Sequence, residues 1–357
     1  MDIRAPADLL ATSGRLERAA QNGPDAERTT ARLAALRTVV GDVIARIDAG
    51  LPELVSSGPG VAAEAARHLL QAGGKRVRPL LLVLSSRAAG GRARADVEER
   101  LAQAAELVHA ATLLHDDVLD DGRMRRGVPA ARVLWGNAAS VLGGDFLLVR
   151  ALELTASTAV PGALPELLDA IGRMIDGEAL QLAHRGRADL DPAGYRAVVD
   201  GKTASLFAWC GRAGARLAQA SAPTIEALGT YGLHLGHAFQ IVDDVLDVEG
   251  DPKKLGKNVL GDLREGKLTL PLLYALEAQP CLRARLQDAA ERDCAEAIAD
   301  EIVDAVKRCR ANERARLAAV AETQAALAAL EAVEVTAGQP FKEALAYIAR
   351  ELCARVA

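Results

Sequence analysis

Two acidic clusters of identical spacing are the residues most suited to chemistry in this chain. Each has the pattern Asp-Asp-x-x-Asp within an apolar run, at residues 116–120 and 243–247. On a helix, positions i and i+4 share a face, so each cluster presents a pair of carboxylates there. Carboxylates on an apolar helix are costly to bury, and oxygen-only ligands suit Mg²⁺ held together with substrate phosphates. The repeat therefore predicts a magnesium site, although either cluster alone could be a solvated helix face.

Basic residues flank the first cluster on both sides in the sequence. Arg125 and Arg126 follow it within Gly-Arg-Met-Arg-Arg-Gly, and residues 73–78, Gly-Gly-Lys-Arg-Val-Arg, place three further cations at a glycine-rich turn. A planar guanidinium group matches phosphate oxygens bidentately, and a glycine turn lets N–H groups and cations converge on an anion. Both segments are interpreted as diphosphate-binding, whereas each alone could be surface cations balancing nearby acid.

Polar groups also surround the second cluster. Phe239 and Gln240 lie one helical turn before it, and lysines occupy short glycine-containing segments before and after it, at Lys202 (followed by Thr203), Lys257 and Lys267. Taken singly, each lysine is most simply a surface residue. Several cations facing two carboxylate pairs nevertheless fit a substrate that has phosphate ends and bridging metal ions.

Composition narrows the function further. The net charge of −5 argues against a nucleic-acid binder, which would show a basic stripe. The five cysteines are scattered without a Cys-x-x-Cys pair, which is typical of reduced thiols. No stretch approaches ~20 uninterrupted apolar residues, and the polar N-terminus does not resemble a secretory signal. These features predict a cytoplasmic protein without a transmembrane segment.

The hydrophobic pattern predicts an all-α protein. Half of the 357 residues are hydrophobic but only 3% are aromatic, and apolar residues recur with helical spacing between breaks rich in glycine and proline. Residues 101–120, 138–159 and 225–249 are long and apolar enough to be central helices. We expect an N-terminal extension over residues 1–37 and one helical-bundle domain over 38–357.

Taken in order, the motifs resemble those of the trans-isoprenyl diphosphate synthases of the polyprenyl synthetase family, over roughly residues 38–357. The matching segments are residues 73–79, 115–127, 144–147, 177–181, 202–203, 239–247 and 256–271. The resemblance implies an isoprenoid-synthase-type bundle of helices around a deep central cavity, usually a homodimer. It implies head-to-tail, trans condensation of isopentenyl diphosphate with an allylic diphosphate.

The resemblance also assigns roles to individual residues. When substrate is bound, three magnesium ions would be held by Asp116, Asp120 and Asp243. Asp117, Asp244 and Asp247 would support these ligands. The allylic diphosphate would be bound by Arg125, Lys202, Lys257 and Lys267. Isopentenyl diphosphate would be bound by Lys75, Arg78, His109, Arg126 and Phe239. The groups that stabilise the allylic cation would be Lys202, Thr203 and Gln240, and the departing diphosphate would take the proton.

Some polar residues have a competing structural interpretation. His109 lies two turns before Asp116, which favours a substrate contact, although a lone histidine on an apolar helix is more often a core residue. His115, Glu178 and Gln181 are left outside the catalytic set as structural or packing residues.

The side chains that precede the first cluster on its helix bear on the length of the prenyl product. In the resembling family, positions one to two turns before the cluster face the growing chain, and short-chain members place bulky aromatics there. Here these positions are Ala111 and Thr112, followed by Val108 and Ala105. The absence of bulk predicts a long-chain product, with Leu152 as a more distant stop.

Three other classes remain to be weighed. A class I terpene cyclase has a differently composed second metal motif and needs aromatic side chains around its cations. A non-catalytic partner subunit commonly loses one acidic cluster, and this chain keeps both. A di-iron bundle would show Glu-x-x-His pairs, which are not visible here.

Overall fold

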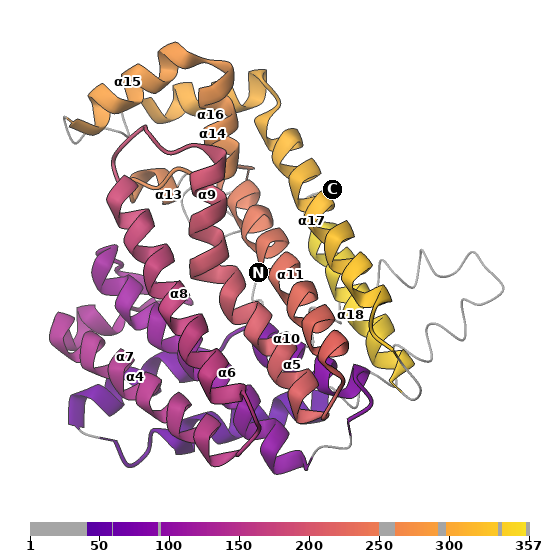
Figure 1. Ribbon diagram of the computed structural model, residues 1–357. Helices are drawn as coiled ribbons and strands as arrows, with labels where there is room; N and C mark the ends of the chain where they lie inside the picture. Colours follow the sequence, from indigo (N-terminus) through magenta and orange to yellow (C-terminus); the bar gives the residue numbers. More distant parts are fainter. Residues whose placement is uncertain are drawn as a thin grey trace.

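The computed structural model describes residues 41–58, 60–91, 94–249, 261–291, 298–334 and 338–354 (Figure 1). The expected extension, residues 1–37, and the predicted diphosphate ligand Lys257 lie outside these residues.

The predicted all-α class is confirmed. A helix over residues 41–54 precedes α4 (Gly60–Gln71), α5 (Val77–Ala88), α6 (Ala95–Leu119), α7 (Ala131–Ser157) and α8 (Ala163–His184). Then follow α9 (Pro192–Val199), the π-helical turn η1 (Asp200–Ala204), α10 (Ser205–Leu217) and α11 (Ala222–Glu249). The C-terminal part contains α13 (Gly261–Arg264), α14 (Leu270–Ala278), α15 (Pro280–Glu291), α16 (Ala299–Arg308), α17 (Ala311–Glu331) and α18 (Gln339–Ala354).

The predicted central helices form, with somewhat different ends. Residues 101–120 lie in α6 and its C-cap, residues 225–249 lie in α11, and α7 begins before residue 138 with a break at Gly136. The basic segment that follows the first acidic cluster contains a short antiparallel hairpin, β1 (Met124–Arg125) with β2 (Val128–Pro129), paired Met124 to Pro129 and Arg125 to Val128.

Buried aromatic side chains tie the long helices together. The Trp209 indole on α10 donates to the carbonyl of Ala163 on α8 at 3.0 Å, and the Tyr231 hydroxyl on α11 donates to Leu345 on α18 at 2.8 Å. Both rings are almost fully buried, so the indole and the phenol need these acceptors. In Figure 1, α9 and α10 follow one another end to end, and α8 and α11 pack against them to form the frame that carries the site.

In the described part of the chain, no helix combines the length and the hydrophobicity that a membrane crossing requires.

Candidate active site

The first acidic cluster ends helix α6. Asp116 and Asp117 lie in its last turn and Asp120 is its C-cap, with the Asp120 N–H donating to the Asp116 carbonyl at 2.8 Å. The i, i+4 relation between Asp116 and Asp120 therefore holds. Burial raises the pKa of Asp116 to about 6 even though Lys202 opposes this rise, and neighbouring Glu178 and Asp120 add to it.

Cations from distant segments converge on this helix end. Lys267 Nζ lies 2.6 Å from an Asp120 carboxylate oxygen and 2.7 Å from Glu265. Burial disfavours the charged lysine, but Asp120 and Glu265 outweigh burial and raise the Lys267 pKa. Arg185 donates to the Leu119 carbonyl at 2.7 Å and lies 3.4 Å from Asp120. A helix C-terminus carries partial negative charge, which explains why positive groups gather here.

Lys202 projects from η1 toward the same cluster. Its ammonium group donates to Gln181 at 2.8 Å, forms an ion pair with Glu178, and lies 3.8 Å from Asp116. Glu178 and Gln181, which sequence analysis left outside the catalytic set, therefore lie within the site. Their spacing of three residues on α8 was the available signal, because such residues share a helix face.

Asp117 and Arg125 pair with each other. Arg125 approaches Asp117 through Nε at 2.7 Å and Nη2 at 2.6 Å, and the Asp117 carbonyl accepts from Gly122 N–H at 2.8 Å. Asp117 is fully buried, and burial raises its pKa although Arg125 lowers it. This pair closes the turn between α6 and the hairpin. The structure thus gives Arg125, predicted to bind the allylic diphosphate, a carboxylate partner.

The second acidic cluster lies near the C-terminal end of α11, is hydrogen-bonded to α9, and is linked to η1 through Gln240. Asp244 accepts from the Tyr195 hydroxyl at 2.5 Å and from the Gln240 amide at 2.9 Å. The Gln240 oxygen in turn accepts from the Thr203 hydroxyl at 3.0 Å. Burial raises the pKa of Asp244 to about 6, against the lowering effect of both hydrogen bonds. Tyr195 was missed by sequence analysis, since a lone tyrosine on a short helix gives no pattern.

Asp247 fastens the segment that returns to the first cluster. Its carboxylate accepts from the N–H groups of Gly261 at 3.2 Å and Asp262 at 3.3 Å, where α13 begins. The Asp262 carbonyl accepts from the Lys267 N–H at 2.8 Å, so this segment links the two clusters. Burial, with the charges of Asp244 and Asp247, raises the pKa of Asp262 to about 8. Asp262 is a further site residue that the cluster pattern did not indicate.

A basic group lies beside the first cluster. Four arginines, Arg76, Arg78, Arg125 and Arg126, approach His109 closely enough to add to the effect of burial and hold its pKa well below the ordinary value. Burial and these positive charges favour the neutral form of the His109 imidazole. Three residues predicted to bind isopentenyl diphosphate, Arg78, His109 and Arg126, are thus brought together, and Lys75 is in the turn just before α5.

Buried contacts hold these arginines. Arg76 and Glu106 form an almost fully buried ion pair, and Arg126 lies 3.5 Å from the same glutamate. Arg126 also donates to the Gly73 carbonyl, which joins the hairpin to the glycine turn. The buried Nε of Arg78 has no hydrogen-bond partner, and its guanidinium lies 4.8 Å from the Phe207 ring centroid.

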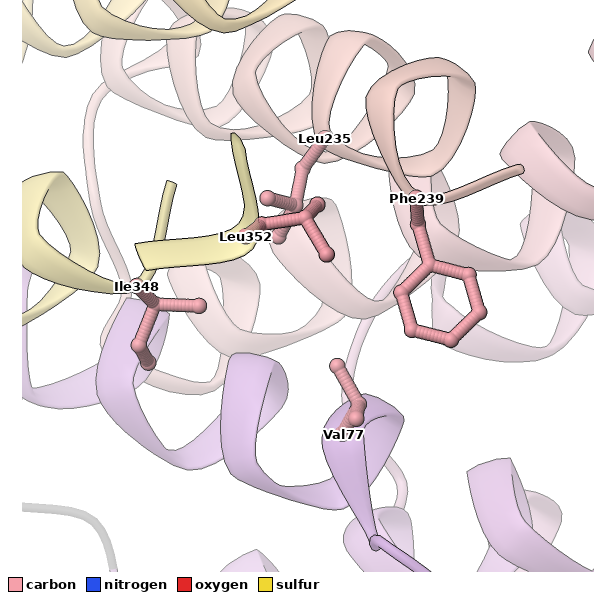
Figure 2. Close-up of a pocket in the computed structure, with 5 residues that line it drawn as sticks. All are labelled: Val77, Leu235, Phe239, Ile348 and Leu352. Carbon is pink, nitrogen blue, oxygen red and sulfur yellow. The ribbon is translucent and has the colours of Figure 1, made fainter. Parts of the chain in front are cut away.

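Phe239 connects this region to an apolar pocket. Its ring lies 5.6 Å from that of Phe207. With Val77, Leu235, Ile348 and Leu352 it lines a small pocket between the start of α5, α11 and α18 (Figure 2).

The predicted chain-length residues lie on α6. Ala111 and Val108 have no exposed surface, whereas Thr112 is half-buried and donates its hydroxyl to the His109 carbonyl at 2.8 Å. The deep central cavity and the role of these residues stay predictions.

The carboxylates of the site fit a hard divalent cation by their chemistry. Their donors are all oxygens, and the buried Asp117 Oδ2 and Asp120 Oδ1 accept no hydrogen bond. Among the residues that the structure describes, no three His, Cys, Asp or Glu side chains converge closely enough to hold a metal ion. Lysine and arginine side chains instead neutralise the first cluster.

Known proteins resemble this chain in sequence and in fold. The polyprenyl synthetase family model matches residues 60–306. Octaprenyl diphosphate synthase from Escherichia coli (strain K12) is 37% identical over 303 residues, covering 85% of this chain and 92% of that protein. A polyprenyl synthase from Caulobacter crescentus CB15, complexed with calcium and isoprenyl diphosphate, superposes with a TM-score of 0.82 at 38% identity, covering 90% and 97% of the two chains.

A decaprenyl diphosphate synthase from Rhodobacter capsulatus gives a TM-score of 0.83 at 34% identity, covering 91% of this chain and 99% of that one. By these matches, the chain belongs to the polyprenyl synthetase family and is a chain-elongating trans-prenyltransferase.

Proposed function

We propose that the protein condenses isopentenyl diphosphate with an allylic diphosphate and releases a long-chain polyprenyl diphosphate. The observation that carries this proposal is the convergence of Lys202 and Lys267 on Asp116 and Asp120 of the first cluster, next to a separate group of arginines around His109. The two groups of cations fit two diphosphates, one that leaves and one that stays on the product.

Asp116, Asp120 and Asp243 would hold Mg²⁺, three ions with substrate bound, with Asp117, Asp244 and Asp247 supporting them. When bound, Mg²⁺ acts as a Lewis acid on the oxygens of the leaving diphosphate. Lys202 and Lys267 would grip that diphosphate, with Lys257 and Arg125 alongside. The Thr203 hydroxyl and the Gln240 amide would orient their dipoles toward the allylic cation.

The second substrate would be held by Lys75, Arg78, Arg126 and neutral His109. A neutral imidazole can donate one hydrogen bond to a phosphate oxygen without adding charge. Carbon–carbon bond formation would leave a proton to be removed, and the departing diphosphate would be the base that takes it.

The direct test is incubation with isopentenyl and farnesyl diphosphates. We expect polyprenyl diphosphate with Mg²⁺ and none after EDTA treatment, restored by adding Mg²⁺. Asp116→Asn and Asp243→Asn should each lower kcat/KM by ~10²-fold or more, because each removes a charged oxygen ligand. A cyclic hydrocarbon product, or turnover that EDTA leaves unchanged, would refute the proposal.

Tyr195→Phe is expected to raise the Mg²⁺ concentration for half-maximal activity by roughly 10-fold. The variant keeps the ring but removes the hydrogen bond that orients Asp244. Tyr347→Phe, on α18, is the matched control and should leave the Mg²⁺ requirement unchanged. An unchanged requirement in Tyr195→Phe would show that this hydrogen bond does not support metal binding.

A long-chain product is supported by the small side chains before Asp116. Neither Ala111 nor Thr112 would block a chain that extends along α6 at ~1.5 Å per residue. We expect Ala111→Phe and Thr112→Phe to shorten the product, as measured by chromatographic sizing after dephosphorylation. Ala111→Val is the conservative control. If the unsubstituted enzyme stops at farnesyl or geranylgeranyl length, the long-chain proposal is wrong.

A homodimer is supported by an exposed apolar face on α7 and α8. Leu142 and Val149 are seven residues apart on α7, and Leu168, Ile175 and Leu182 repeat the same interval on α8. Seven residues are two helical turns, so each set forms a stripe. The exposed fractions include 53% for Leu142 and 63% for Ile175, which is unusual for contiguous apolar residues on a monomer.

Ile175→Glu should therefore shift the molar mass measured by light scattering from dimer to monomer, since it places a charge in the interface. Leu317→Glu on α17 is the control, because Leu317 is 69% exposed but lies outside these stripes. A monomer in the unsubstituted protein would refute the dimer.

The scattered cysteines, of which those described are free, also support a cytoplasmic enzyme.

A further inference from the structure

The turn that presents Lys202 and Thr203 has unusual backbone geometry. Residues Asp200–Ala204 are π-helical, between α9 and α10. Such turns are rare, and they shift the direction in which the following side chains project. The contacts that hold η1 therefore decide where Lys202 and Thr203 point.

Helix α8 packs against η1 at backbone distance. A Cβ atom added to Gly177 would lie 2.4 Å from the backbone nitrogen of Lys202, and one added to Gly201 would lie 2.5 Å from the carbonyl oxygen of Arg173. Only glycine permits this approach. The Ser205 hydroxyl donates to the Gly201 carbonyl at 2.6 Å and satisfies that group within the turn.

The Asp200 carboxylate joins η1 to the helices on both sides. It accepts from Arg173 Nη2 on α8 at 2.5 Å and lies 3.1 Å from His237 Nε2 on α11. An ionised carboxylate only accepts hydrogen bonds, so His237 is the second donor. The hydrogen bond from His237, together with Arg173, holds the Asp200 pKa below its ordinary value despite burial. His237 is almost fully buried, which restricts its movement.

The same two helices hold the next residues of the turn. Glu178 and Gln181 on α8 contact Lys202, and Gln240 on α11 contacts Thr203. On α11, His237, Gln240 and Asp244 follow at i, i+3 and i+7, which places them on one face. A displacement of η1 at Asp200 would therefore move Lys202 and Thr203 relative to both aspartate clusters.

We propose that Asp200, held by Arg173 and His237, is a positioning residue that sets the π-helical register from which Lys202 and Thr203 meet the allylic diphosphate. Asp200 acts through Lys202 and Thr203 and does not touch the substrate itself. This inference rests on the proposed function and deepens it.

Calorimetric titration with farnesyl thiolodiphosphate and Mg²⁺ tests the proposal without turnover. In this analogue, sulfur replaces the bridging oxygen and slows ionisation. Asp200→Ala should weaken its binding by about 10-fold, while isopentenyl diphosphate binds as before. Asp200→Asn keeps one acceptor oxygen and should lose less affinity for the analogue. When Lys202 is already replaced by alanine, adding Asp200→Ala should weaken analogue binding by less than about two-fold, because Asp200 affects this binding through Lys202.

Steady-state kinetics supply the second readout. Asp200→Ala should lower kcat/KM for the allylic substrate by on the order of 10- to 100-fold and leave the KM for isopentenyl diphosphate unchanged. Asp191→Ala is the control, because Asp191 caps α9 by accepting from the Gly194 N–H at 2.7 Å and should lower Tm without changing either KM.

Two results would overturn the inference. One is unchanged binding of the analogue in Asp200→Ala. The other is that Asp200→Ala weakens analogue binding as much in the Lys202→Ala variant as it does in the unsubstituted protein. Loss of folded protein in Asp200→Ala is distinguished by circular dichroism, and His237→Gln then carries the same test. If the unsubstituted protein neither binds the analogue nor elongates farnesyl diphosphate, the proposed function fails, and the role of Asp200 fails with it.

Discussion

The negative charge at the end of α6 is the constraint around which the site is built. Asp116 and Asp120 share one face at a helix C-terminus, where the helix dipole already adds partial negative charge. Burial without a counter-charge would cost several kcal/mol per carboxylate. Three cations, Lys202, Lys267 and Arg185, come from separate segments to offset it. The positions of η1, the end of α8 and the segment after α13 follow from this need.

The same cations couple the binding of metal to the binding of diphosphate in the proposed site. A lysine that neutralises a carboxylate can turn to a phosphate oxygen when a divalent ion takes over the carboxylate. Since Lys267 contacts both Asp120 and Glu265, it keeps one carboxylate partner during such an exchange. Metal and diphosphate would then bind together more readily than either alone, and by linkage each raises the affinity for the other to the same extent.

Local patterns in the sequence predicted much of this arrangement. The helical class, the central helices and the i, i+4 pairing of Asp116 with Asp120 depend on periodicity over a few turns, and the structure has them. Partnerships across the fold were not predictable. Tyr195 meets Asp244 from a separate helix, and Arg125 turns back to Asp117 because of a hairpin that no alternating pattern indicates. The π-helical register of η1 likewise depends on packing against α8.

Calorimetric titration of Mg²⁺, with and without saturating farnesyl thiolodiphosphate, tests the exchange of charge at α6 most directly. In the proposed mechanism the lysines that neutralise the aspartates would leave when the metal binds, and the diphosphate would accept them. We predict Mg²⁺ affinity at least about 10-fold higher with the analogue than without it. Equal affinity under both conditions would contradict the account, because the lysines would then not compete with the metal for Asp116 and Asp120.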